Sequence, residues 1–350
     1  MDRYEEIEQR LSQKPRVSLG FFPTPLQRLE RLSEELGVEL YIKRDDFTGI
    51  SLFGGNKIRK LEYLLGDAVE KGCDTLITFG ATQSNHAMQT ATAARKCGLY
   101  PILYLMAIVE PKPEDVRANL LLDQILGAEV HIVPTKGKTI EEAMAECRRL
   151  AEGRKKERER AGHRCYEVPV GGATDIGSAG FIGGYTELCR QMENLGIQAD
   201  YIVTASGSGG TAAGLAAGIA AAGDPVQLIS MATFTIEEGY EDTIADLASG
   251  ALRYIGLETK VRAADILAER AYQAPGYEIP SEQANEAIRR LARTEGILTD
   301  PVYSGKAFGG LLDYIEKGKI PKGSTVAFWH TGGATALFAE PEIIGSLAER

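Results

Sequence analysis

The stretch CDTLITFGATQSNHAMQTATAARKCGLYPILYLM, residues 73–106, predicts the fold class of this chain. Its first part, CDTLITFG, is a short apolar run that is typical of a buried strand. The part that follows, HAMQTATAARKCG, is typical of a helix that ends at Gly98, and YPILYLM returns to a strand. Strand-like and helix-like segments keep alternating for most of the chain. This alternation predicts an α/β fold with mostly parallel sheets.

Composition and charge narrow the class of protein. The chain has 350 residues, enough for two lobes, and its net charge of -10 argues against binding to nucleic acid. It contains no apolar run of about 18 residues, so no membrane span is predicted. The five cysteines and four histidines lack the spacing of metal ligands, so no metal site is predicted. The charged N-terminus lacks the pattern of a secretory signal, so we expect a cytoplasmic protein.

Glycine, serine and threonine cluster in GGATDIGSAG, residues 171–180, and this cluster indicates a boundary between two lobes. We predict a smaller α/β domain at residues 53–172. Residues 1–52 are placed with residues 173–350, and together they are predicted to form a larger domain.

The stretch FGGNKIRKLEYLLGDA, from residue 53, predicts an amphipathic helix with a lysine at its start. Lys57 precedes Leu61 by four residues and Leu64 by seven, so it shares their apolar face. A buried ammonium must be paired, neutral or covalently used. Two interpretations remain open: an amine that bonds to an aldehyde cofactor, or an amine that reaches a carboxylate at the helix edge. The other charged residues of this helix are expected to reach water: Arg59, Lys60, Glu62 and Asp67.

Two strand-to-helix junctions are candidate anion sites. In GATQSNHAMQT, the start of a helix could bind a substrate carboxylate, or Ser84 or Asn85 could be a plain helix cap. The second junction, TASGSGGTAAG, offers amides and hydroxyls to a phosphate, although it could also be a tight turn. It fits a dinucleotide fingerprint too, but the next strand, VQLISMATF, ends without the acidic residue which that fingerprint requires. A phosphate is therefore favoured over a dinucleotide.

Two C-terminal stretches, LTDPVYSGKAFGG and FWHTGGATALF, add candidate hydroxyls. The phenol of Tyr303 could transfer protons, and the hydroxyl of Thr331 could meet a ring nitrogen. Packing in the core is the alternative for each.

Taken together, GGNKIRKLEYL, QSNH, DPVYSGKA and HTGGATALF resemble the signatures of D-cysteine desulfhydrases and aminocyclopropane carboxylate deaminases. These are pyridoxal phosphate (PLP) enzymes of the tryptophan synthase β fold type. The segment PTPLQRLERLSEELGVELYIKRDD, from Pro23, resembles the N-terminal part of that group, so the likeness covers nearly the whole chain. It implies a two-lobed, three-layer α/β/α fold, pyridoxal 5'-phosphate as cofactor, bound by the larger domain, a small amino acid as substrate, and a homodimer.

The resemblance also implies a role for each matching position. Lys57 would hold the cofactor covalently, Asn85 would approach its phenolic oxygen, and Thr331 would lie at its pyridine nitrogen. The other cofactor-binding positions, of which the last six form the phosphate loop, would be Asn56, Ser206, Gly207, Ser208, Gly209, Gly210 and Thr211. The substrate-binding positions would be Gln83, Ser84, Asn85, His86, Tyr303 and Ser304, and the catalytic ones Lys57, Ser84 and Tyr303.

Three positions sort this chain within the resemblance. Ring-opening deaminases carry glutamate after the tyrosine, glutamine after Gln-Ser-Asn, and leucine before the late Gly-Gly. Here these positions hold Ser304, His86 and Thr331, which resemble the desulfhydrases. A neutral hydroxyl near the pyridine nitrogen makes a weaker electron sink than a carboxylate would, which favours loss of a good leaving group over ring opening.

The expected reaction is α,β-elimination of D-cysteine to pyruvate, sulfide and ammonia. The alternative is an L-cysteate sulfo-lyase that releases pyruvate, sulfite and ammonia, and aminocyclopropane carboxylate deamination is less favoured. Thr335 departs from the pattern, because desulfhydrases often resemble one another in a proline there.

Overall fold

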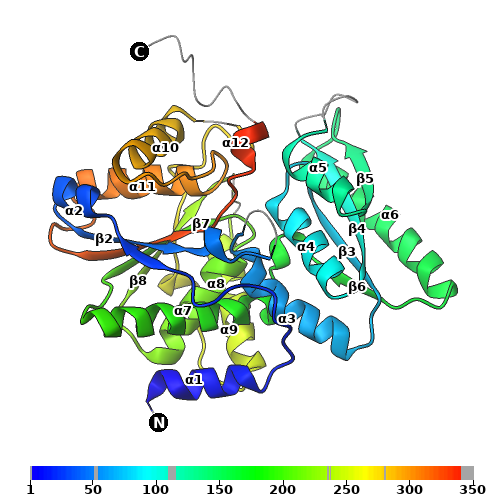
Figure 1. Cartoon of the computed structure of the whole chain (residues 1–350), viewed down its shortest axis with the longest axis horizontal. Coiled ribbons are helices and arrows are strands. Elements are labelled where there is room, and N and C mark those ends of the chain that lie inside the picture. Colours follow the sequence, from blue (N-terminus) through cyan, green and yellow to red (C-terminus); the bar gives the residue numbers. More distant parts are fainter. Residues whose placement is uncertain are drawn as a thin grey trace.

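The computed structural model describes residues 2–50, 54–108, 116–234, 236, 238–279 and 281–339. These residues form two sheets that lie side by side (Figure 1). The larger sheet has, in spatial order, β1 Leu26–Arg28, β2 Glu39–Arg44, β10 Thr325–His330, β7 Tyr201–Ser206, β8 Gln227–Ala232 and β9 Leu267–Glu269. The smaller sheet has β5 Glu129–Pro134, β4 Tyr100–Ala107, β3 Thr75–Ala81 and β6 Cys165–Val168. Among the described residues every ladder is parallel except that of β1 with β2.

Helices cover both faces of each sheet and complete the predicted three-layer α/β/α architecture. Apolar residues of α1, α7, α8 and α9 pack on one face of the larger sheet, and those of α2, α10 and α11 pack on the other. On the smaller sheet, α3 and α4 lie opposite α6, with α5 beside α4. The helix bounds are α1 Arg3–Ser12, α2 Glu30–Leu36, α3 Lys57–Glu70, α4 Asn85–Lys96, α5 Ala118–Ile125, α6 Ile140–Arg160, α7 Asp175–Leu195, α8 Gly210–Ala222, α9 Tyr240–Tyr254, α10 Glu282–Glu295, α11 Ser304–Glu316 and α12 Ala336–Ala339.

The strand-to-helix junctions bring helix starts to the carboxyl ends of the strands. All seven residues of β3 are buried because helices cover both faces of its sheet, which explains why its sequence lacks charged residues and does not alternate between polar and apolar. The side chain of Ser84 then accepts from the amide of Ala87 and begins α4. After β7, Gly209 adopts a φ of 81°, a left-handed conformation that glycine accepts at little cost, and α8 begins.

The exposure predicted for the charged residues of α3 is wrong. Arg59, Lys60, Glu62 and Asp67 are all buried, with exposed fractions of 5%, 1%, 2% and 9%. The sequence period identifies the apolar side of a helix, but it does not reveal that other segments enclose the polar side. Here α3 lies between the two sheets, packs on α7, and is covered by the N-terminal segment around Leu19.

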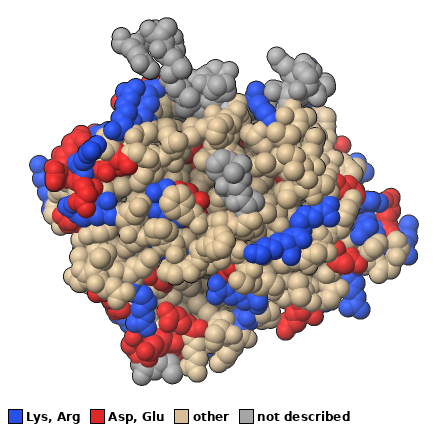
Figure 2. All heavy atoms as spheres, in the orientation of Figure 1, with Lys and Arg blue, Asp and Glu red and all other residues tan. Residues whose placement is uncertain are grey.

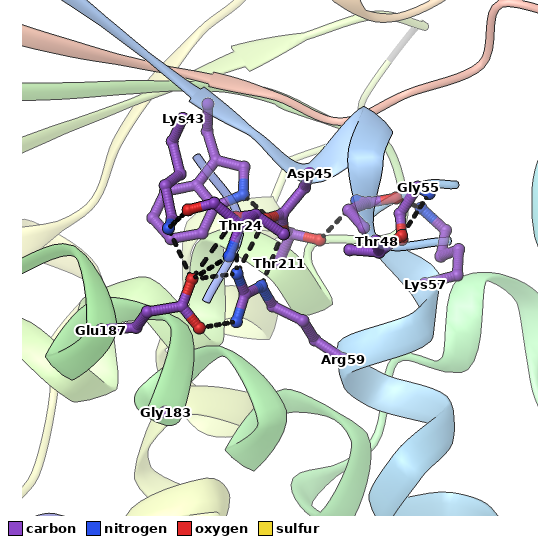
Figure 3. Close-up of polar contacts among 12 residues, drawn as sticks. Thr24, Lys43, Asp45, Thr48, Gly55, Lys57, Arg59, Gly183, Glu187 and Thr211 are labelled. Atoms are coloured by element: carbon purple, nitrogen blue, oxygen red, sulfur yellow. Dashed lines mark hydrogen bonds and ion pairs between the residues drawn. The ribbon is translucent and has the colours of Figure 1, made fainter. Parts of the chain in front are cut away.

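Each enclosed charge on α3 has a partner from another part of the chain. Arg59 donates to Asp45 at 2.7 and 2.8 Å and to Glu187 at 2.9 and 3.0 Å (Figure 3). Glu62 accepts from the amides of Leu19 and Gly20. These pairs satisfy charges that would otherwise be costly to bury, and they anchor the helix that carries Lys57.

The predicted domain boundaries at 52/53 and 172/173 stay predictions, and the first of them lies outside the described residues. No helix in the described ranges is long and apolar enough to cross a membrane. On the face shown in Figure 2, acidic and basic side chains are interspersed over both lobes.

Candidate active site

A cavity of about 600 Å³ lies between the two sheets, where the carboxyl ends of β3, β4 and β7 converge. Parallel α/β sheets commonly bind ligands at this edge, because the following loops and helix starts point there. The cavity wall includes most of the residues singled out from the sequence: Asn56, Lys57, Ser84, Asn85, His86, Ser206, Gly207, Ser208, Gly209, Thr211, Tyr303 and Thr331. Gln83, Gly210 and Ser304 are not part of this wall.

Lys57 is the first residue of α3, and its amine faces the cavity. Nζ donates to Oδ1 of Asn56 at 2.9 Å, and within the described ranges no carboxylate forms an ion pair with it. Burial lowers the pKa of Lys57 to about 8, although the charge of Asp300 opposes this effect. The described contacts therefore do not support the interpretation of Lys57 as a lysine that reaches a carboxylate.

Asn56 connects this lysine to the start of α8. Its Nδ2 donates to the hydroxyl of Thr211 at 2.9 Å, while its Oδ1 accepts from Lys57. Its backbone amide donates to the carbonyl of Thr331 at 3.1 Å. The side chain of Asn56 thus joins the lysine to the glycine-rich loop.

The start of α8 is built to hold an anion. No side chain caps this helix, and the backbone amides of residues 208–212 have no acceptor among the described residues. Uncapped amides and the positive end of the helix dipole form a binding site for a phosphate. The donor set of this loop therefore fits the phosphate of PLP, and the nearby amine of Lys57 fits its aldehyde.

Lys60 is a cavity residue that sequence reasoning missed. Its Nζ donates to the carbonyl of Gly171 at 3.1 Å and lies 2.9 Å from the point that a Cβ on Gly210 would occupy. Burial, and then the charge of Lys57, hold its pKa well below the ordinary value. Its spacing of three residues from Lys57 was the available signal, because positions i and i+3 lie on one side of a helix.

The start of α4 supplies a second set of donors. The backbone amides of Asn85 and His86 have no acceptor among the described residues, and Ser84 caps the helix. The ring of His86 bonds the hydroxyl of Thr78 at 2.9 Å, and burial holds its pKa well below the ordinary value, so the ring is neutral. Gln83 instead accepts from the amide of Asn119 and donates to a carbonyl outside the cavity.

Two tyrosines form the wall opposite this helix start. Tyr303 precedes α11, and its hydroxyl lies 2.7 Å from that of Tyr277. Its ring centre is 6.0 Å from Nζ of Lys57. Burial raises the pKa of both phenols, so both keep their protons at neutral pH. Tyr277 lies in an irregular loop, and its sequence carries no motif that could have identified it.

Ser304 is fully buried rather than open to a substrate. Its hydroxyl donates to the carboxylate of Asp300, which also accepts from the amides of Val302, Tyr303 and Ser304. The geometry therefore places Ser304 in the support of α11, away from the cavity wall, contrary to the expected substrate contact. The sequence singled out both Tyr303 and Ser304, but it did not reveal which of the two hydroxyls would face the cavity.

A shielded lysine with a lowered pKa, in the same cavity as an uncapped helix start, fits the class of enzymes that use pyridoxal phosphate. The family model described as pyridoxal-phosphate dependent enzyme matches residues 17–332, and this chain belongs to that family.

Individual relatives narrow the group. The chain is 39% identical over 334 residues to a protein of Klebsiella pneumoniae named D-cysteine desulfhydrase, covering 95% of this chain and 98% of that protein. It is 39% identical over 342 residues to a protein of Burkholderia lata named 1-aminocyclopropane-1-carboxylate deaminase, with the same coverage of both chains. A solved structure described as an ACC deaminase homologue matches with a TM-score of 0.85 at 38% identity, covering 97% of this chain and 98% of that one.

These findings confirm the fold of the tryptophan synthase β type and the PLP cofactor. The chain is a PLP-dependent deaminase or lyase of the group that contains D-cysteine desulfhydrases and aminocyclopropane carboxylate deaminases. The two names occur at equal identity, so similarity alone does not choose the substrate.

Proposed function

We propose that this enzyme catalyses α,β-elimination on a small β-substituted amino acid, with D-cysteine as the preferred substrate and pyruvate, sulfide and ammonia as products. PLP, when bound, supplies the electron sink that makes the Cα–H bond of the substrate acidic. The residues of the cavity provide binding, orientation and proton transfer.

Cofactor binding is assigned to the two lysines and the two helix starts. The uncapped amides of residues 208–212, the hydroxyl of Thr211 and Lys60 are proposed to hold the phosphate. The charge of a bound phosphate would favour the protonated form of Lys60, which burial by itself disfavours. Lys57 is proposed to hold the aldehyde, Asn85 to approach the phenolic oxygen, and Thr331 to lie at the pyridine nitrogen.

Substrate binding is assigned to the start of α4. The free amides of Asn85 and His86 and the hydroxyl of Ser84 are proposed to bind the substrate carboxylate, because a helix start favours an anion. Met106 and Met144 line the same cavity from the side of the smaller sheet and are proposed to keep water away from the reacting atoms.

Proton transfer is divided between Lys57 and Tyr303. Because the pKa of Lys57 is lowered to about 8, its neutral amine is available to accept the α-proton at Nζ. The raised pKa of Tyr303 favours a protonated phenol, and the hydroxyl of Tyr277 lies 2.7 Å away. We therefore assign Tyr303 as the acid that protonates the leaving sulfur.

The choice of elimination over ring opening rests on Thr331, which offers a hydroxyl to the cavity and not a carboxylate. The neighbouring carboxylate, Asp300, is not part of the cavity wall and is occupied by three backbone amides and the hydroxyl of Ser304. A hydroxyl in place of a free carboxylate favours loss of a good leaving group over ring opening.

The cations of the cavity favour cysteine over cysteate. The described wall residues include two lysines, Lys57 and Lys60, and no arginine, and both lysines are assigned to the cofactor. A sulfonate on the β-carbon would need a further cationic partner. The L-cysteate sulfo-lyase is therefore the second candidate. The cytoplasmic location and homodimeric assembly expected above remain part of this proposal.

A substrate panel tests the proposal. PLP-loaded enzyme is incubated with D-cysteine, L-cysteine, L-cysteate, β-chloroalanine and aminocyclopropane carboxylate, and kcat/KM is measured from pyruvate or 2-oxobutyrate. D-cysteine is expected to give the highest value, with equimolar sulfide. A higher value for aminocyclopropane carboxylate or L-cysteate would replace the proposed substrate, and absence of turnover with every compound would refute the lyase assignment.

A further inference from the structure

The amide of Asn85 is held from outside the cavity by two side chains of other elements. Its Oδ1 accepts from Nδ2 of Asn119, in α5, at 2.8 Å. The same oxygen lies 3.2 Å from the hydroxyl of Thr335, which immediately precedes α12. α5 and α12 are in contact, so these two partners approach Asn85 from neighbouring segments (Figure 1).

Hydrogen-bond chemistry fixes which end of this amide faces which way. Nδ2 of Asn119 also donates to the backbone carbonyl of Gln83 at 2.8 Å. A carbonyl oxygen only accepts, so the atom of Asn119 that faces it must be the amide nitrogen. That nitrogen is a donor, so the atom of Asn85 that faces it must be the oxygen. The hydroxyl of Thr335 then donates to this oxygen as well.

The consequence concerns the other end of the amide. Nδ2 of Asn85 has no acceptor among the described residues, and Asn85 lines the cavity. Its donor N–H groups are therefore available to a ligand, whereas its acceptor is already occupied. The opposite orientation would present an oxygen to the ligand, which would repel an anionic oxygen.

We propose that Asn119 and Thr335 are positioning residues that lock the amide of Asn85 with its N–H groups toward the phenolic oxygen of PLP. The inference rests on the placement of Asn85 proposed above, but not on the identity of the substrate. The hydroxyl of Thr335 stands where desulfhydrases often have a proline, which could make no such bond.

The readout is the visible absorption of the bound cofactor, titrated with pH in the absence of substrate. A donor to the phenolic oxygen withdraws charge from it, so the nearby nitrogen of the lysine–cofactor link holds its proton less tightly. Loss of this donor is expected to raise the pH midpoint of the absorption change by about one unit. The reason is that the free energy of a hydrogen bond to a charged group is comparable to the free energy of a one-unit pKa shift. The other ionisable groups that line the cavity are unchanged in every variant below: Lys60, His86, Glu141, Tyr277 and Tyr303. Asp300, which lies outside the wall but whose charge acts on Lys57, is also unchanged.

Asn119→Asp is the decisive variant. A carboxylate only accepts, so it would attract Nδ2 of Asn85 and turn the amide over. We expect a midpoint shift in the same direction as that of Asn85→Ala, and at least as large. In the Asn85→Ala background, Asn119→Asp should add no shift, because the residue acts through Asn85. Thr335→Val should give a smaller upward shift.

Thr92→Val is the matched control, because the hydroxyl of Thr92 bonds the carbonyl of Met88 within α4 and its removal should leave the midpoint unchanged. An unchanged midpoint in Asn119→Asp would overturn the positioning role. So would a shift caused by Asn119→Asp that is as large in the Asn85→Ala background as in the wild type. If Asn85→Ala itself leaves the midpoint unchanged, the placement of Asn85 fails and the inference with it. If the PLP-loaded wild-type protein shows no visible band, the assignment of Lys57 as the residue that holds the aldehyde is refuted instead.

Discussion

The hydroxyl of Tyr303 lies 2.7 Å from the hydroxyl of Tyr277, and both phenols line the cavity that contains the amine of Lys57. In the proposed mechanism, Tyr303 gives its proton to the leaving group and regains one from Lys57, which has accepted the α-proton. The hydroxyl of Tyr277 can stabilise the transient phenolate by a hydrogen bond.

Removing the Tyr303 hydroxyl should slow elimination. Tyr303→Phe is expected to lower kcat by about 10²-fold with D-cysteine, the usual scale for a lost general acid. The loss should be smaller with β-chloroalanine, whose chloride needs no proton to leave. Steady-state kinetics on both substrates measure this difference. Tyr314→Phe removes a hydroxyl from the far end of the same helix, where it bonds Glu269, and should change neither rate. Equal losses on both substrates would contradict the acid role.

Lys57→Ala should lose the covalent attachment of the cofactor. We expect no visible band that borohydride reduces, and a fall in turnover of about 10³-fold or more, because both the attachment and the base are removed. Mass spectrometry after borohydride treatment should locate the added mass on Lys57 in the wild type. Added mass on Lys60 in its place would exchange the two assignments.

Lys60→Met should weaken cofactor binding rather than chemistry. The lost charge-assisted hydrogen bond to the phosphate is expected to raise the Kd for PLP by about 10- to 100-fold. Titration of cofactor-free protein with PLP, followed by absorbance, gives this constant. Lys71→Met, at the other end of α3, removes a mostly exposed lysine paired with Asp67 and serves as the control. Unaltered affinity together with reduced kcat would place Lys60 in catalysis instead.

The lowered pKa of Lys57 predicts a pH dependence for cofactor loading. Only the neutral amine attacks an aldehyde, and its fraction rises with pH until the pKa is passed. The rate constant for PLP attachment to cofactor-free protein should therefore increase up to about pH 8, the pKa of Lys57, and then level off. An ordinary lysine would continue to gain reactivity up to about pH 10.4. A rate constant that still rises at about pH 10 would show that the pKa of Lys57 is not lowered.

The buried Arg59 network should be essential to stability. Arg59→Met leaves the carboxylates of Asp45 and Glu187 without their shared partner, which is expected to lower the free energy of unfolding by about 3–5 kcal/mol. Urea denaturation with the cofactor bound measures the loss. Arg262→Met breaks an exposed pair with Asp265 and should cost no more than about 1 kcal/mol. A loss for Arg59→Met as small as this would mean that the network adds little net stability.

The sequence by itself determined the class of fold and singled out many of the polar residues that line the cavity. Buried parallel strands need continuous apolar runs, and helix starts need capping or glycine residues, so the alternation and the junctions at Ser84 and Gly209 were visible locally. Lys57 was identifiable because a charge on an apolar helix face has few possible explanations.

Only the tertiary structure decided which polar groups face the cavity. Arg59 and Lys60 belong to a helix whose polar side is also enclosed. Tyr277 comes from an irregular loop and contacts Tyr303. The hydroxyl of Ser304 donates to Asp300 instead of facing the cavity. Asn119 and Thr335 meet at Asn85 from positions distant in the chain. Such contacts depend on how separate elements pack, and neither residue type nor spacing within one element carries that information.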